Sequence, residues 1–412
     1  MKMTKILALV IALLMVSACF VGCFGEEKMT ITLWVSTTAG VKEFTLQQVE
    51  AFKAATGYDF DIVVEAVGEG DAAGEVLKDV ATAPDMYCFA QDQISRLVQG
   101  GALAPLGVQA TADVIANNDA GSVGAATVGE KVYAYPLTAD NGYYLYYDSR
   151  YISDEQAKTL EGVIAACEAA NKKFGYNVTN AWIMAGFFFS QPVGGGDPIC
   201  HSNWTYSEDG KTAIGLDDNF NSNNGFIAMK EMQEIASSPM FVDTADTFAG
   251  TAAIVTGIWN ANAAASEYGD YVKATKLPTF EGVDGNTYQM GSFSGYKLLG
   301  VKPQSDEKKA KICSDLAMYL TSGEAQLERY FEFQWGPSNL EAQADENVKE
   351  NVLLGALIQQ NEFAVPQGVI HEKWWDTAKV LGDIAKTADK TDDDLRAALE
   401  DYQKTVDTFI TK

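Results

Sequence analysis

From residue 29 onward the sequence alternates strand-like and helix-like segments, and this order restricts the folds that the chain can adopt. In the first segment Met29, Ile31, Leu33 and Val35 fall on one face, with the period of two that is typical of a half-buried strand. Strand, helix, strand, helix, strand implies parallel pairing through right-handed crossovers. We predict an α/β fold with strands at residues 29–36, 59–67 and 85–90 and helices at 41–57, 72–82 and 93–99.

The composition is that of a large globular protein. The chain has 412 residues, of which 47% are apolar and 21% are charged, so it can bury a core and does not have the composition of a disordered chain. The length fits two or three domains, or one protein with two lobes. The net charge of −26 argues against nucleic acid as a partner, because phosphate binding needs clustered Lys and Arg.

The N-terminus carries the clearest local signal. Lys2 and Lys5 precede a charge-free apolar run, and this order, followed by small residues, is typical of a secretory leader. The segment VSAC, which ends at Cys19, resembles a bacterial lipobox, in which the cysteine becomes the lipidated first residue. We predict that residues 1–25 form the signal peptide and lipid-anchor region, with lipid on Cys19. Lipidation of Cys23 and an uncleaved anchor helix are the alternatives.

Motifs for several kinds of catalysis are incomplete. The G-x4-G spacing that begins at Gly124 has Glu130 where a phosphate loop needs lysine. The calcium-like segment from Asp217 has Ala228 in place of the bidentate glutamate. The segment GSFSG places Phe293 where a nucleophilic serine would stand. The sequence does not exclude a carboxylate pair for glycoside hydrolysis, because the chain has 56 acidic residues.

Cysteine and histidine are scarce in the body of the chain. Zinc spacing and CxxC pairs are missing, and the chain has only two histidines, which disfavours metal sites and Ser–His or Cys–His catalysis. We therefore expect no metal and no cofactor. We predict isolated buried thiols, with one disulfide as the alternative, at Cys88, Cys167, Cys200 and Cys313.

Seven segments occur in the order of a known family. They are the lipobox, ITLWVS, APDMYCFAQDQ, GEKVYAYPLTADNGYYLYYDS, GIWNAN, KLPTFEG and YLTSGEAQ. Together they resemble the extracellular solute-binding proteins of sugar ABC importers, with an organisation close to maltose-binding protein, over nearly all of the mature chain. The resemblance implies two α/β lobes with a ligand cleft between them and several hinge crossovers. It places residues 28–138 and about 287–333 in the first lobe, and about 143–281 and 338–412 in the second.

The same resemblance implies a receptor and not an enzyme. A monomer, held by its lipid on the outer side of the bacterial cytoplasmic membrane, captures a carbohydrate and delivers it to the permease subunits of an ABC transporter. An oligosaccharide is the expected ligand. Receptors for ferric ion, polyamines, peptides or other organic solutes are alternatives within the same class. A surface enzyme that acts on glycosides is the alternative from another class.

The resemblance also implies ligand-binding residues in the first lobe and at the hinge. Phe89 matches the position of a cleft tryptophan, and Asp92 matches an aspartate that hydrogen-bonds sugar hydroxyls. Asp140 matches a cleft glutamate, and a shift of one residue gives this role to Asn141. The maltose binders carry Asp and Lys in their first loop, where this chain has Ser36-Thr37-Thr38, so maltose itself is not implied while a sugar remains so.

Further binding residues are implied on the second lobe. Trp259 matches a tryptophan on which a sugar ring stacks, and Trp182, within AWIMAGFFF, is the expected aromatic platform of that lobe. Trp375 and Lys379 match a tryptophan and an arginine one helical turn apart, although Trp374 competes for the first of these positions. Aromatic rings cover the apolar face of a pyranose, and Asp, Asn and Gln bind its hydroxyl rim.

A run of four tyrosines follows the expected hinge at residues 140–142. The family places this run on a strand that crosses between the lobes. Alternation then puts Tyr143 and Tyr147 on one face and Tyr144 and Tyr146 on the other. We predict that they pack in the core and between the lobes, and that the first two lie near enough to the hinge to reach the cleft.

Overall fold

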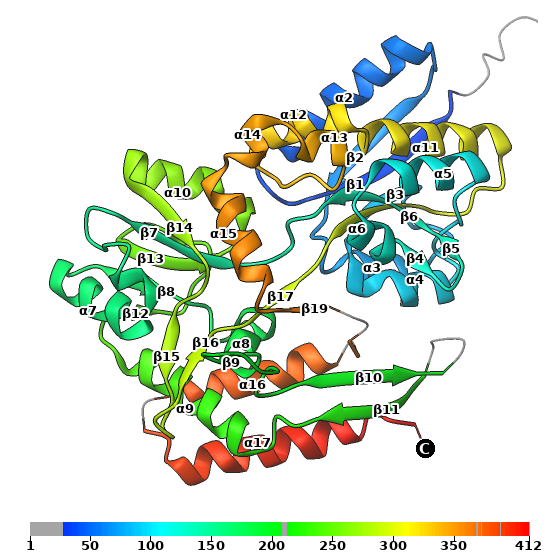
Figure 1. The fold of residues 1–412 in the computed structure, drawn as a ribbon. Coiled ribbons are helices and arrows are strands. Elements are labelled where there is room, and N and C mark those ends of the chain that lie inside the picture. The colour runs from blue at the N-terminus through cyan, green and yellow to red at the C-terminus, as the bar shows by residue number, and fades with distance from the viewer. Residues whose placement is uncertain (1–27, 208–211, 368–369, 372, 388, 412) are drawn as a thin grey trace, which may run out of the picture.

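The computed structural model describes residues 28–207, 212–367, 370–371, 373–387 and 389–411, which form two lobes of mixed helices and strands (Figure 1). The predicted lipidation sites, Cys19 and Cys23, lie outside the described residues. Within the described ranges, no helix combines the length and the apolar character needed to cross a membrane.

The first lobe is built on a five-stranded sheet with the strand order β2-β1-β3-β18-β6. Strand β1 pairs in parallel with β2 and β3, while β18 pairs antiparallel with β3 and β6. The predicted parallel start of the fold is therefore confirmed, and a strand from much later in the sequence completes the sheet. The strands are β1 (Thr30–Val35), β2 (Asp61–Ala66), β3 (Met86–Ala90), β6 (Ala134–Thr138) and β18 (Lys297–Val301).

Helices surround this sheet, and one of them is shorter than the sequence predicts. The helix expected over residues 72–82 ends at Val76. Asp79 Oδ1 accepts a hydrogen bond from Ala81 N at 3.0 Å, which favours a turn over a further helical turn. The helices and the small hairpin of this lobe are α2 (Val41–Thr56), α3 (Ala72–Val76), η1 (Gln91–Gln93), α4 (Ile94–Gln99), α5 (Val108–Asn117), α6 (Ala120–Ala125), β4 (Thr127–Val128), β5 (Lys131–Val132), α11 (Glu307–Leu320) and α12 (Gly323–Phe333).

A second five-stranded sheet, in the order β12-β8-β13-β7-β14, forms the centre of the other lobe. Its strands are β7 (Tyr144–Asp148), β8 (Lys173–Gly175), β12 (Phe241–Val242), β13 (Thr251–Thr256) and β14 (Val272–Thr275). Thr391 caps the last helix through a capping box with Asp394, so the acidic run at its start has a structural role. The helices are η2 (Gln156–Lys158), α7 (Leu160–Ala170), α8 (Ala181–Phe188), α9 (Asn223–Ser237), η3 (Ile258–Asn260), α10 (Ala261–Tyr268), η4 (Gly269–Tyr271), α16 (Trp374–Ala385) and α17 (Asp392–Asp407).

Three of the four tyrosines lie on β7, and the tyrosine run separates two buried clusters of side chains. Tyr143, Leu145 and Tyr147 belong to the cluster of the second lobe, while Tyr144 and Tyr146 belong to the cluster that includes the first sheet. The predicted alternation is confirmed. The hydroxyls of Tyr144 and Tyr146 lie 2.7 Å apart, which satisfies two polar groups in a buried setting.

Short elements join the lobes and extend the second one. Helix α15 packs on β7 and β14, while its Leu353, Leu354 and Leu357 belong to the buried cluster of the first sheet; it therefore contacts both lobes (Figure 1). The parallel pair β17–β19 lies beside this helix. These elements are β9 (Gln191–Pro192), β10 (Ser202–Tyr206), β11 (Ala213–Asp218), β15 (Thr279–Glu281), β16 (Thr287–Gln289), β17 (Ser292–Ser294), α13 (Leu340–Gln343), α14 (Glu346–Lys349), α15 (Val352–Asn361) and β19 (Ala364–Pro366).

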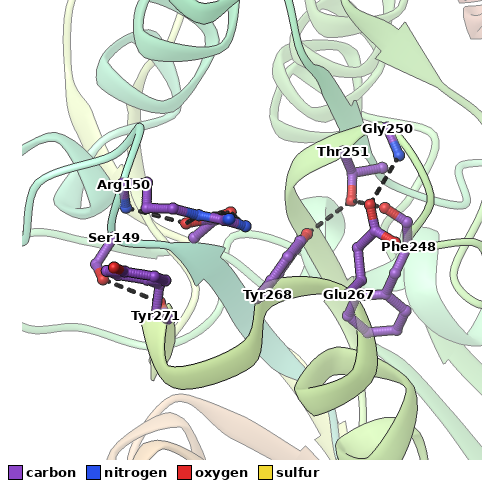
Figure 2. Close-up of polar contacts among 9 residues, drawn as sticks. Ser149, Arg150, Phe248, Gly250, Thr251, Glu267, Tyr268 and Tyr271 are labelled. Atoms are coloured by element: carbon purple, nitrogen blue, oxygen red, sulfur yellow. Dashed lines mark hydrogen bonds and ion pairs between the residues drawn. The ribbon is translucent and has the colours of Figure 1, made fainter.

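Hydrogen bonds fasten α10 and η4 to the second sheet (Figure 2). The hydroxyls of Thr251 and Tyr268 lie 2.6 Å apart, and Thr251 Oγ1 also donates to Phe248 O. The backbone N–H and the hydroxyl of Ser149 both donate to Tyr271 O at 2.9 Å. These contacts fix the segment that directly follows η3, and η3 carries one of the candidate binding residues.

The four cysteines of the body of the chain are buried free thiols. The alternative of a disulfide among Cys88, Cys167, Cys200 and Cys313 is therefore wrong, and the prediction of isolated thiols is confirmed.

Candidate functional site

A cavity of about 520 Å³ lies between the lobes, within the size range of small-molecule sites. Three stretches of its wall directly follow the parallel strands β1, β2 and β3, which agrees with the rule that ligands bind at the carboxyl ends of such strands. The cavity is lined by Ser36, Thr37, Thr38, Glu69, Gly70, Asp71, Ala90, Asp92, Gln93, Asn141, Asn180, Trp182, Trp259, Lys297, Gln367 and Trp375.

Three tryptophans of the second lobe form the aromatic part of the wall. Trp182 and Trp259 have ring centroids 5.9 Å apart, and Trp375 lies against Phe293 at 5.8 Å. Its neighbour Trp374 is fully buried, because α16 turns that residue toward the core. Of the two candidates on α16, the cavity therefore contains Trp375.

The N-terminus of α8 positions Trp182. The side chain of Asn180 caps this helix and accepts a hydrogen bond from Trp182 N at 2.9 Å. Every residue of α8 except Trp182 is buried, so the helix is fixed by its core contacts while its first turn presents one indole to the cavity. Trp182 also packs edge-on against Tyr143, with ring centroids 4.7 Å apart.

A glycine makes room for the ring of Trp259. A Cβ atom on Gly257 would lie 2.0 Å from Cζ3 of Trp259, far inside van der Waals contact. The indole of Trp259 therefore lies directly on the backbone of Gly257, two residues before it. The backbone of Gly257 has ordinary negative φ, so the glycine serves this close approach and not an unusual conformation.

The opposite wall carries the charged groups. The oxygen Oδ1 of Asp92 is inaccessible and has no hydrogen-bond partner among the described residues. Burial raises the pKa of Asp92 to about 7, while the positive charge of Arg96 acts in the opposite direction. The ammonium of Lys297 lies 3.6 Å from Glu69 Oε1. Asp92 therefore contributes a carboxyl to the cavity wall, and one of its two oxygens is buried without a hydrogen-bond partner among the described residues.

Lys297 connects the charged wall to the aromatic wall. Its ammonium lies 5.4 Å from the ring centroid of Trp259 and 4.6 Å from that of Trp335, close enough for cation–π attraction to both. Lys297 begins β18 of the first lobe, whereas Trp259 belongs to the second lobe. The contact therefore spans the cavity.

The structure brings five of the eight predicted binding residues together, and three lie elsewhere. Phe89 is fully buried beside Tyr87 in the first sheet, because its position on β3 points it into the core. Lys379 is exposed on α16 and is not among the lining residues. Asp140 is also outside the cavity. The five that line it are Asp92, Asn141, Trp182, Trp259 and Trp375.

Asp140 holds the hinge segments together. Its Oδ2 accepts a hydrogen bond from Gly336 N at 2.7 Å, and Ala139 N donates to Gly336 O at 2.9 Å. Burial raises the pKa of the Asp140 carboxyl, with the charge of Lys297 opposing the shift. Of the two alternatives at the hinge, Asn141 is the residue that lines the cavity.

Several residues that line the cavity were not predicted from the sequence. Glu69 and Gln93 follow β2 and β3 and could have been found by listing the residues just after each predicted parallel strand. Lys297 and Gln367 adjoin β18 and β19, whose pairing partners are remote in sequence, and no local pattern marks them.

Among the described residues, no three His, Cys, Asp or Glu side chains gather in a geometry that could hold a metal ion.

Comparison with known proteins identifies the family. Residues 47–356 match the family model of the bacterial extracellular solute-binding proteins. The chain belongs to this family. Its members act outside the cytoplasm, and the predicted family resemblance and two-lobed fold are both confirmed. A comparison with curated protein sequences finds no match.

Solved structures of other solute-binding proteins share the fold. The maltodextrin-binding protein MalE1 from L. casei BL23 is 24% identical with a TM-score of 0.73, covering 92% of this chain and 99% of that chain. The maltose/maltodextrin-binding domain MalE from Bdellovibrio bacteriovorus, bound to maltotriose, is 17% identical with a TM-score of 0.75, covering 92% and 99%. The GacH receptor of Streptomyces glaucescens is 16% identical with a TM-score of 0.71, covering 94% and 100%.

Proposed function

We propose that this solute-binding protein captures a carbohydrate, an oligosaccharide in particular, in the cavity between its lobes and delivers it to an ABC importer. One observation carries the proposal: Trp182, Trp259 and the carboxyl-bearing Asp92 line the same cavity between the lobes. Indole rings suit the apolar face of a pyranose, and a carboxylate oxygen accepts a hydrogen bond from a hydroxyl. Structural neighbours that bind maltodextrin or maltotriose support the same ligand class.

Capture followed by transport needs no chemical step. The lining residues offer stacking surfaces and hydrogen-bonding groups, which is what reversible binding requires. We propose that the two lobes close on the sugar, since hinge closure is the common response of two-lobed receptors, and that the protein acts as a monomer and not as an enzyme. The lobe boundaries proposed from the sequence, 28–138 with about 287–333 and about 143–281 with 338–412, describe the two moving parts.

Isothermal titration calorimetry with linear and cyclic oligosaccharides tests the ligand class. We expect one group of sugars to bind, and we expect Trp259→Ala and Trp182→Ala each to weaken that binding at least tenfold, which corresponds to about 1.4 kcal/mol. Binding of a sugar that neither substitution weakens would place the sugar outside this cavity.

The pH dependence of binding tests the role of Asp92. A hydrogen bond to a charged acceptor is roughly twice as strong as one between neutral groups, so the sugar should bind best when Asp92 is ionised. Because the pKa of Asp92 is about 7, we expect the affinity to rise several-fold between pH 6 and pH 8. In Asp92→Asn the affinity at pH 8 should be about tenfold lower and should no longer change with pH. Equal pH profiles in both proteins would remove Asp92 from the binding site.

We also propose that the protein is tethered to the cytoplasmic membrane by a lipid on Cys19, with Cys23 as the alternative. In bacteria fed a labelled fatty acid, Cys19→Ala should release the protein from the membrane fraction and remove the label, while Cys23→Ala should leave both unchanged. The reverse pattern would assign the lipid to Cys23. A membrane-bound protein that stays unlabelled in both variants would favour the uncleaved anchor helix.

A further inference from the structure

Gln367 lies where the two lobes meet at the cavity. It follows β19, is 5% exposed, and its backbone N–H donates to Ser294 O at 2.9 Å. Its backbone carbonyl accepts a hydrogen bond from Gln91 Nε2 at 2.8 Å, and its side-chain oxygen Oε1 accepts one from Trp182 Nε1 at 3.0 Å. One residue therefore connects the end of β3 in the first lobe to an aromatic platform of the second lobe.

The hydrogen bond to Gln367 restricts the indole of Trp182. Trp182 is half-buried, and its ring lies beside those of Tyr143 and Trp259, with centroid distances of 4.7 and 5.9 Å. An indole has a single polar donor, so an acceptor at that atom fixes the rotation of the ring about its side-chain bonds. A platform that is already oriented does not lose that freedom when a ligand arrives.

We propose that Gln367 is a positioning residue that sets the orientation of Trp182 for ligand stacking and ties this platform to the first lobe through Gln91. The inference rests on the proposed function for its consequence in sugar binding, but its structural claim concerns the protein without ligand. Sequence reasoning found Trp182 and not Gln367, because the two residues are 185 positions apart.

The side chain of Gln367 also acts on the other wall of the cavity. Besides Arg96, the amide of Gln367 holds down the pKa of Asp92 against the effect of burial. The same side chain therefore hydrogen-bonds the aromatic platform and influences the carboxyl of Asp92. Removing the amide should move the pH at which the affinity changes toward a higher value, which a general loosening of the fold would not do.

The test uses Gln367→Met, which keeps the length of the side chain and removes its polar atoms, and Gln367→Glu, which keeps an acceptor for the indole. Gln109→Met is the matched control, because the side chain of this exposed glutamine hydrogen-bonds Asp113 on its own helix. In the protein without sugar, we expect the indole N–H resonance of Trp182 to move toward that of a free indole in Gln367→Met, to stay in the hydrogen-bonded range in Gln367→Glu, and to be unchanged in the control.

Sugar affinity supplies the second readout. At a pH well above the pKa of Asp92, where its carboxyl is ionised with or without the amide, we expect Gln367→Met to weaken binding about tenfold. When Trp182 is already replaced by phenylalanine, which has no N–H group, the effect of Gln367→Met should be less than twofold. An equal loss in both backgrounds would mean that Gln367 contacts the sugar directly and would overturn the positioning role. An unmoved indole resonance in Gln367→Met would overturn it as well. If the resonance moves while no sugar binds, the positioning role stands and the proposed function fails.

Discussion

Replacing Gly257 by alanine should weaken sugar binding about 30-fold, the loss expected when a central aromatic contact worth about 2 kcal/mol is removed. The new methyl group would occupy the position of the Trp259 ring, 2.0 Å from Cζ3, so the indole must leave its place in the cavity. The substitution should reduce sugar affinity more than it reduces the stability of the fold, because hydrogen bonds fasten the segment after η3 to the second sheet. Titration calorimetry with the tightest-binding oligosaccharide measures the effect.

Gly355→Ala is the matched control for this substitution. Gly355 lies within α15, and a Cβ atom there would meet nothing within 4 Å. Alanine in a helix should leave binding unchanged and should stabilise the protein by about 0.5–1 kcal/mol. Wild-type affinity in Gly257→Ala, with Trp259→Ala strongly impaired, would show that the ring can bind sugar from another position and would contradict the proposed platform.

Replacing Glu231 by glutamine should stabilise the protein at alkaline pH. Glu231 lies on α9, is 6% exposed, and burial raises its pKa to about 8, with repulsion from Glu234 and Glu161 adding to the shift. The native state therefore retains a proton that the unfolded chain releases near its ordinary pKa of 4.5. Between these two pKa values the free energy of unfolding falls as the pH rises. At 1.36 kcal/mol per pKa unit, the total loss is up to about 5 kcal/mol.

Glutamine stays neutral and removes this dependence. Below pH 4.5 Glu231 is neutral in both states, so the variant and the original protein should unfold at similar temperatures. At pH 8 and above, Glu231→Gln should melt several degrees higher. Glu234→Gln, an exposed position on the same helix, is the control and should change the melting temperature much less. Scanning calorimetry from pH 4 to pH 9 measures both, and a gain in Glu231→Gln that is equal at all pH values would contradict the raised pKa.

The sequence predicts the architecture well where its pattern is local. Strands with a period of two and helices between them gave the parallel start of the first sheet, and the alternation in the tyrosine run predicted which rings enter which cluster. The helix at residues 72–82 was too long in the prediction, because the turn at Asp79 depends on a side-chain hydrogen bond that apolar spacing does not reveal. Strand β18 joins β3 across the chain, a pairing that no local pattern contains.

Some residues of the site could be predicted from the sequence and others could not, for a physical reason. Trp182, Trp259 and Trp375 came from the resemblance to the family, in which Trp259 stands in one of the matching segments, and the structure places all three at the cavity. Phe89 stands in an aligned segment too, but β3 points its side chain into the core. Lys297 and Gln367 depend on tertiary pairing, so only the folded chain brings them to the cavity. A side chain's direction and its remote partners decide whether it reaches a ligand.

Thermal melting across solute classes tests the central claim most directly. The chain without its predicted leader, residues 27–412, is heated with oligosaccharides, polyols, amino acids, polyamines, peptides and ferric ion in turn. A ligand at about 100 times its dissociation constant adds roughly 2.7 kcal/mol to the native state, which means a rise of about 2–4 °C for a chain of this length. We predict that one group of sugars raises the melting temperature and that Trp259→Ala abolishes the rise. A clear rise with a polyamine, a peptide or ferric ion, and none with any sugar, would contradict the carbohydrate receptor.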